Sequence, residues 1–131
     1  MIKKVDHIGV AVRDIEEARR PYEALGLKVT HVKEVEEQQV RVAFLPVGDT
    51  EVELVQPTTA DSGVARFLEK RGEGVHHLCF EVEDIEAALA ELQAQGMRLI
   101  DQEPRQGAFG RVAFLHPKST HGVLIELVEK S

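Results

Sequence analysis

The sequence predicts an α+β fold in which two tandem βαβββ modules form a curved mixed sheet with helices on its outer face. Two observations lead to this prediction. A long stretch of sequence recurs at an offset of 70 residues. Apolar residues also alternate in the same way along the first strand of each copy. Because side chains alternate across a strand, this pattern assigns residues to faces.

The repeat extends over most of the chain. Residues 5–18 (VDHIGVAVRDIEEA) align without a gap with residues 75–88 (VHHLCFEVEDIEAA). The run RVAFL occurs at 41–45 and again at 111–115, and VELV at 52–55 matches IELV at 125–128 after a longer loop. So many matches in one register indicate a duplicated unit. We therefore predict a single domain over 1–131, made of repeats at about 1–56 and 75–131.

Each copy predicts one helix. Asp14 and Asp84 are good N-caps in front of apolar residues at helical spacing, and Gly26 and Gly96 supply the C-terminal stops. Pro21 interrupts the first helix and predicts a kink or an early end. The linker 57–74 is expected to hold a short third helix, capped by Asp61 or Ser62. The remaining apolar runs predict strands at 5–12, 27–33, 40–46, 50–55, 75–82, 97–101, 111–116 and 123–129.

The amino-acid composition argues against some classes of function. The chain of 131 residues has 43% hydrophobic and 30% charged residues, as expected of an ordinary globular protein. Its net charge of −7 argues against nucleic acid as the main partner. Cys79 is the single cysteine, so no intramolecular disulfide can form. No apolar run is long enough for a membrane span and no signal peptide is evident, so we expect a cytoplasmic protein.

The alternation along the first strand of each copy distinguishes the histidines. Ile8 and Val10 lie on a bulky face that suits helix packing, whereas His7 lies on the face with smaller residues, where a cleft can form. His77 is the repeat partner of His7. The adjacent His76 matches Asp6 and is expected to point to the opposite face.

The last strand of each copy carries a glutamate between apolar residues, Glu53 in the first and Glu126 in the second. A lone strand glutamate usually faces solvent, and a lone strand histidine usually has a structural role. Here one His and one Glu recur in each copy, and a pseudo-twofold axis would gather all four. We therefore predict a divalent metal bound by His7, Glu53, His77 and Glu126, with open positions for catalysis. The mixed N/O set suits Co²⁺, Ni²⁺, Mn²⁺, Fe²⁺ or Zn²⁺.

The chain resembles the vicinal oxygen chelate superfamily and, within it, the methylmalonyl-CoA epimerases. The resemblance covers essentially the whole chain. It rests on residues 6–12 (DHIGVAV), 53–57 (ELVQP), 67–78 (FLEKRGEGVHHL) and 116–127 (HPKSTHGVLIEL), of which the last two are the most specific. It implies a glyoxalase-like fold and metal ligands at His7, His77 and Glu126. Glu53 falls where family members can carry Gln, so its support comes partly from the repeat.

The resemblance also implies the reaction. A metal-dependent isomerase of this family would interconvert (2R)- and (2S)-methylmalonyl-CoA by α-proton abstraction through an enolate, with Co²⁺ as the first expectation for the metal. Glu126 and Glu53 are the candidate acid/base residues on opposite sides of the carbon. Arg41, Arg111 and Lys118 are candidates for binding the anionic acyl-CoA, against the alternative that they are solvated side chains. We also expect a homodimer, as is usual for small members of the superfamily.

Two other functions remain open. A glyoxalase I-type lactoylglutathione lyase has the same fold and can use the same ligand set, so the ligands do not separate the two. A metal-free binding protein of this fold would have no need for four repeat-related ligands. Metal analysis and a comparison of substrates distinguish these alternatives.

Overall fold

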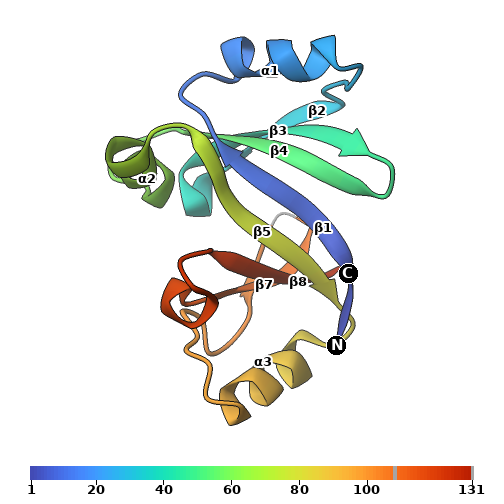
Figure 1. Cartoon of the computed structure of the whole chain (residues 1–131), viewed down its shortest axis with the longest axis vertical. Coiled ribbons are helices and arrows are strands. Elements are labelled where there is room, and N and C mark those ends of the chain that lie inside the picture. Colours follow the sequence, from blue (N-terminus) through green and yellow to red (C-terminus); the bar gives the residue numbers. More distant parts are fainter. Residues whose placement is uncertain (108, 131) are drawn as a thin grey trace. The chain divides into compact units, whose positions relative to one another are not determined.

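The computed structural model describes residues 1–107 and 109–130 (Figure 1). Its contacts divide the chain into two compact units. The N-terminal unit comprises residues 7–76, and the C-terminal unit comprises residues 1–6 together with 77–131. The linker 57–74 belongs to the N-terminal unit. Whether the two repeats form a single domain stays a prediction.

Each unit contains the elements of one βαβββ module (Figure 1). The first module and linker contain β1 (Ile2–Ala11), α1 (Ile15–Ala24), β2 (His31–Val35), the 3-10 turn η1 (Glu36–Gln38), β3 (Val40–Val47), β4 (Thr50–Pro57) and α2 (Gly63–Arg71). The second contains β5 (Gly74–Val82), α3 (Ile85–Ala94), β6 (Arg105–Gln106), β7 (Gly110–Leu115), the 3-10 turn η2 (Pro117–Thr120) and β8 (Ile125–Lys130).

The strands form a mixed sheet. In the N-terminal unit the order is β2-β3-β4-β1, with β1 parallel to β4 and the other pairs antiparallel. In the C-terminal unit the order is β1-β5-β8-β7-β6, with β5 parallel to β8, and β8-β7-β6 antiparallel. The start of β1 belongs to this second unit. Eight strands and three α-helices over the described residues confirm the predicted fold class.

Helices pack on the faces that the alternation predicted. In the N-terminal unit, Ile15 of α1 packs with Val12, Leu45 and Leu54. In the C-terminal unit, Ile85, Ala88 and Leu89 of α3 pack with Val82 and the neighbouring strands β7 and β8. These buried apolar contacts are the main stabilising contribution of each helix, because short isolated helices are marginal in water.

The helix boundaries follow the sequence signals. The Asp14 carboxylate accepts the Glu16 N–H at 3.0 Å, and that of Asp84 accepts the Ala87 N–H at 3.1 Å. Gly26 and Gly96 adopt φ of +99° and +85° after the helices, a conformation that favours glycine. In the linker, Ser62 caps α2 by accepting the Ala65 N–H at 3.0 Å.

The expected early end of the first helix at Pro21 is wrong, because α1 continues to Ala24. Pro21 is exposed, so the carbonyl that loses its helical partner can be hydrated. The predicted strand at 97–101 is also wrong: this segment makes one isolated bridge, Leu99 to Leu115, and the short strand β6 follows. The Asp101 carboxylate accepts the Phe114 N–H at 2.9 Å, replacing the backbone acceptor that a continued strand would offer.

The other predicted strands differ from the structure only in their ends. β2 starts at His31, later than predicted, and β8 starts at Ile125. None of the helices in the described segments is long and apolar enough to cross a membrane.

Candidate metal centre

A buried His/Glu pair lies within the N-terminal unit. His7 is on β1 and Glu53 on the parallel strand β4, where Glu53 is in register with Gly9. The His7 Nδ1 lies 3.2 Å from the Glu53 Oε2, and the two side chains are only 9% and 11% exposed. Because Gly9 has no side chain, the Glu53 carboxylate has room to lie beside the imidazole two residues earlier on the same face.

The C-terminal unit contains the same arrangement. His77 is on β5 and Glu126 on the parallel strand β8, in register with Cys79. The His77 Nε2 lies 3.4 Å from the Glu126 Oε1, and these side chains are 9% and 8% exposed. Phe114, the antiparallel neighbour of Glu126, contacts the His77 ring edge-on with 6.3 Å between centroids. The repeat in the sequence is therefore a repeat of strand register and of side-chain pairing, although His7 faces its glutamate with Nδ1 and His77 with Nε2.

The chemistry of these pairs fits a divalent metal. Burying a carboxylate costs free energy unless a cation or hydrogen bonds compensate it. Because each unit buries a carboxylate next to an imidazole, both groups are expected to have a function. Each pair offers one imidazole nitrogen and one carboxylate oxygen. Nitrogen and oxygen donors of this kind suit the first-row divalent ions.

The neighbouring histidine, His76, has a different environment. It contacts the ring of Phe67 on α2 edge-on, with 5.0 Å between centroids. Burial lowers the pKa of His76 below its ordinary value. Consecutive strand residues point to opposite faces, so His76 supports α2 while His77 pairs with Glu126.

Arg41 and Arg111 do not lie on the His/Glu faces. Arg111 of β7 contacts Glu86 of α3 at 3.2 Å and Glu129 of β8 at 3.0 Å, which places it on the helix side of its strand. Arg41 and Phe44 are an odd number of positions apart along β3, so their side chains point to opposite faces. The Arg41 guanidinium lies 3.6 Å from the Glu34 carboxylate. Strand alternation therefore directs both arginines to the face opposite the glutamates, and their part in substrate binding stays a prediction.

Glu129 has a structural role that the sequence did not reveal. Its Oε1 accepts the N–H of Ile85, the first residue of α3, at 2.9 Å. This hydrogen bond and the Arg111 guanidinium lower the pKa of Glu129 below its ordinary value. The hydrogen bonds to Glu129 and Glu86 in turn raise the pKa of Arg111.

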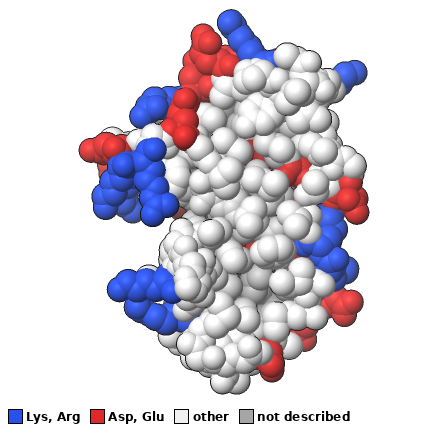
Figure 2. All heavy atoms as spheres, viewed as in Figure 1, with Lys and Arg blue, Asp and Glu red and all other residues white. Residues whose placement is uncertain are grey.

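Lys118 is the exposed residue of the η2 turn between β7 and β8, whose other residues are half-buried. His116 caps this turn, because its Nδ1 accepts the Lys118 N–H at 3.1 Å. Lys and Arg side chains also gather over α2 (Figure 2), where Arg66, Lys70 and Arg71 are exposed. The net negative charge of the chain therefore does not exclude local basic surfaces.

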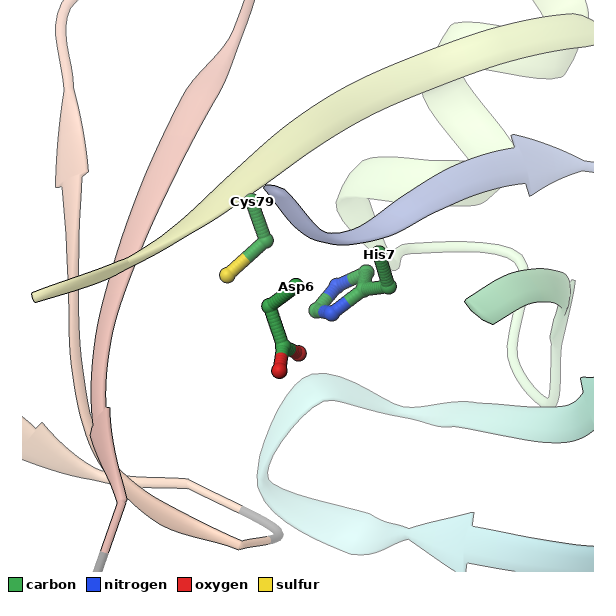
Figure 3. A group of neighbouring side chains, drawn as sticks. All are labelled: Asp6, His7 and Cys79. Carbon is green, nitrogen blue, oxygen red and sulfur yellow. The ribbon is translucent and has the colours of Figure 1, made fainter. Parts of the chain in front are cut away.

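Cys79 is completely buried beside Asp6 in the C-terminal unit (Figure 3). A carboxylate oxygen of Asp6 lies within 4.8 Å of the Cys79 sulfur. Asp6 also forms an ion pair with Lys130 of β8, at 2.6 Å from Oδ1 to Nζ. The thiol contacts Val112 and Val128, so it fills space on the same face of β5 as His77.

Comparisons with known proteins agree with this architecture. The sequence profile described as the Glyoxalase/Bleomycin resistance protein/Dioxygenase superfamily matches residues 6–114. The uncharacterized protein YqjC of Bacillus subtilis (strain 168) is 48% identical over 98% of this chain and 93% of its own length. The ethylmalonyl-CoA/methylmalonyl-CoA epimerase of Cereibacter sphaeroides is 41% identical over 97% of this chain and 98% of its own length.

A solved structure gives the same result. The structure described as methylmalonyl-CoA epimerase in complex with methylmalonyl-CoA and NH4+ matches with a TM-score of 0.92 and 41% identity. The match covers 100% of this chain and 96% of that one. The chain therefore belongs to the methylmalonyl-CoA epimerase family, within the glyoxalase/bleomycin resistance protein/dioxygenase superfamily.

Proposed function

We propose that this protein interconverts (2R)- and (2S)-methylmalonyl-CoA. The observation that carries the proposal is the full-length similarity to an epimerase whose solved structure contains methylmalonyl-CoA. The two buried His/Glu pairs support it, because removing a proton from carbon needs both a positioned base and stabilisation of the resulting charge. This family match favours epimerisation over the lactoylglutathione lyase reaction.

We infer that His7, Glu53, His77 and Glu126 hold one divalent metal ion together, with Co²⁺ as the first candidate and Ni²⁺, Mn²⁺, Zn²⁺ or Fe²⁺ as alternatives. Support comes from the donor chemistry of each pair and from the repeat relation between the pairs. When bound, such an ion supplies Lewis-acid stabilisation of negative charge on substrate oxygens.

The glutamates are the proposed acid and base. The α-carbon of the substrate lies between a carboxylate and a thioester carbonyl, so loss of its proton leaves an enolate. In one direction the carboxylate of Glu126 takes the proton, and a protonated Glu53 returns one to the opposite face of the carbon; whichever glutamate carries the proton is released from the metal while it does so. In the other direction the roles exchange, and no net proton is gained or lost. Low solvent exposure of both side chains protects the enolate from bulk water.

Lys118 is the proposed contact for a phosphate of coenzyme A. Its exposed position in a turn held by His116 keeps the ammonium group at the protein surface, where the long coenzyme A chain would emerge. Arg41 and Arg111 are not part of this proposal, because Arg41 pairs with Glu34 of β2 and Arg111 with Glu86 of α3.

A direct assay tests the proposal. The Co²⁺-loaded protein is incubated with (2R)- or (2S)-methylmalonyl-CoA in D₂O, and in parallel with methylglyoxal and glutathione. We expect epimerisation with incorporation of deuterium at the α-carbon and no formation of lactoylglutathione. Lactoylglutathione formation without epimerisation would contradict the proposal.

A further inference from the structure

An aromatic ring lies beside each glutamate of the His/Glu pairs. Phe44 on β3 is in register with Glu53 on β4, and Phe114 on β7 is in register with Glu126 on β8. Residues in register across antiparallel strands share a face, so each ring lies next to its buried pair. Phe114 also contacts the ring of His77.

The two units differ in the group that covers this ring. In the N-terminal unit, His31 of the edge strand β2 stacks on Phe44, with 4.3 Å between centroids and 14° between planes. In the C-terminal unit, the Cζ of Arg105 lies 5.6 Å from the centroid of Phe114. A guanidinium over a ring face is attracted by the ring's quadrupole. The C-terminal unit therefore places a permanent cation one ring away from His77 and Glu126.

Arg105 is held in this position by Asp101. The Arg105 Nε lies 3.1 Å from the Asp101 Oδ1, and the Nη2 lies 3.3 Å from the Oδ2. The same carboxylate accepts the Phe114 N–H, and its side chain is only 14% exposed. Asp101 is the repeat counterpart of His31. Where the N-terminal unit has an imidazole stacked on Phe44, the C-terminal unit has a carboxylate that holds a guanidinium over Phe114.

The ion pair with Asp101 leaves further N–H donors on the Arg105 guanidinium. Asp101 uses the Nε and Nη2 edge of the guanidinium, which has five N–H groups in total. The Arg105 side chain is 51% exposed. A guanidinium that is fixed on one edge and accessible on the other is suited to bind a carboxylate through two parallel hydrogen bonds.

We propose that Arg105, positioned by Asp101 and Phe114, binds the free carboxylate of the acyl-CoA substrate. This inference rests on the proposed function, because it takes a 2-carboxyacyl thioester as the ligand. The carboxylate is attached directly to the carbon that loses its proton, and Phe114 is the common neighbour of Arg105 and His77. Arg105 thereby selects acyl groups that carry an acid function and orients them in front of the His77–Glu126 pair.

Binding to two related thioesters tests the role of Arg105. The Co²⁺-loaded protein is titrated calorimetrically with malonyl-CoA, which carries the carboxylate, and with acetyl-CoA, which lacks it. Arg105→Met should weaken malonyl-CoA binding about 10- to 100-fold, as charge-assisted hydrogen bonds predict, and leave acetyl-CoA binding unchanged. Arg105→Lys keeps the charge without the planar fork and should recover only part of the affinity.

Arg20→Met is the matched control, because Arg20 is an exposed arginine on α1 that lies 3.9 Å from Glu17. Equal weakening of both thioesters by Arg105→Met would place a coenzyme A phosphate at Arg105 and overturn the carboxylate assignment. Unchanged affinity for both would show that Arg105 binds neither group. If Arg105→Met does not fold, Arg105→Lys carries the same comparison. Wild-type protein that binds malonyl-CoA but does not epimerise methylmalonyl-CoA contradicts the proposed function alone.

Discussion

The N-terminal and C-terminal units agree closely where the His/Glu pairs lie and differ around them. Each unit pairs a histidine of its first strand with a glutamate of its last strand, next to a phenylalanine. At the helix start, however, the N–H of Ile15 is accepted by Gln56, whereas that of Ile85 is accepted by Glu129. Either a neutral amide or a carboxylate can accept the N–H of the first helical residue.

The strand connections differ too. A tight turn joins β3 to β4, while the η2 turn joins β7 to β8. His31 covers the ring of Phe44, and Arg105 that of Phe114. Features that both units share therefore mark what each copy supplies to the proposed metal site, namely one nitrogen and one oxygen donor. Features present in one unit mark where the copies can have acquired separate tasks, such as the proposed binding of the substrate carboxylate by Arg105 in the C-terminal unit.

The largest effect is expected from removing one imidazole. If the pairs hold one ion together, His7→Ala and His77→Ala should each lose the metal and lower the rate by about three orders of magnitude, since metal stabilisation of charge is worth several kcal/mol. Metal content and turnover are measured together. His76→Ala is the control and should retain the metal. A variant of His7 that keeps full metal content would show that the units do not share the ion.

Glu126→Gln should have the next largest effect. The amide keeps an oxygen donor but cannot take a proton, so the metal is retained and turnover falls by about two orders of magnitude, the usual contribution of a positioned base. Glu129→Gln, on the helix face of the same strand, is the control for turnover. A rate close to wild type for Glu126→Gln would remove Glu126 from the proton transfer.

Glu53→Gln shows whether the two glutamates have the same task. If Glu53 is the second base, exchange of the α-proton with D₂O should persist from one stereoisomer and fail from the other, while epimerisation falls by at least about tenfold. Mass spectrometry of each isomer after incubation measures this asymmetry. Equal exchange from both isomers with normal epimerisation would leave Glu53 as a ligand only.

The helix caps should contribute equally in the two units. Asp14→Ala and Asp84→Ala each remove a side-chain acceptor from a helix start, and each should cost about 1 kcal/mol in the free energy of unfolding. Urea denaturation measures both. A much smaller loss for Asp84→Ala would indicate that the charged Glu129 compensates at the start of α3.

The smallest effect is expected from Glu129→Gln, which reproduces the Gln56 arrangement of the N-terminal unit. The pKa of Glu129 is lowered on folding by the Ile85 N–H and by Arg111. Its contribution to stability is therefore present above the ordinary pKa of glutamate and is lost as the pH falls through the lowered value. Wild type should lose slightly more stability than the variant between about pH 5 and 3, as thermal melts at several pH values would show.

Much of the fold could be predicted because the signals involved are local. The caps Asp14 and Asp84 and the stops at Gly26 and Gly96 act within one turn of a helix, and the structure confirms all four. The segment 97–101 was predicted wrongly because its pairing with β7 is irregular, and the spacing of apolar residues within the segment does not reveal this. An apolar run looks like a strand, but the Phe114 N–H is accepted by the Asp101 carboxylate, while the Phe114 carbonyl accepts the backbone N–H groups of Ile100 and Asp101.

Strand alternation together with the internal repeat was enough to predict the two His/Glu pairs from sequence. Which arginine lies near a pair could be decided only by the tertiary structure. Arg41 and Arg111 belong to the clearest repeat in the chain, yet both lie on the opposite face from the glutamates. Arg105 follows a loop without periodicity, and its position over Phe114 depends on a carboxylate and a ring brought together by folding. The face on which a strand residue lies follows from its position among neighbouring residues in the sequence. Contacts between a loop and a strand depend instead on the path of the chain that connects them.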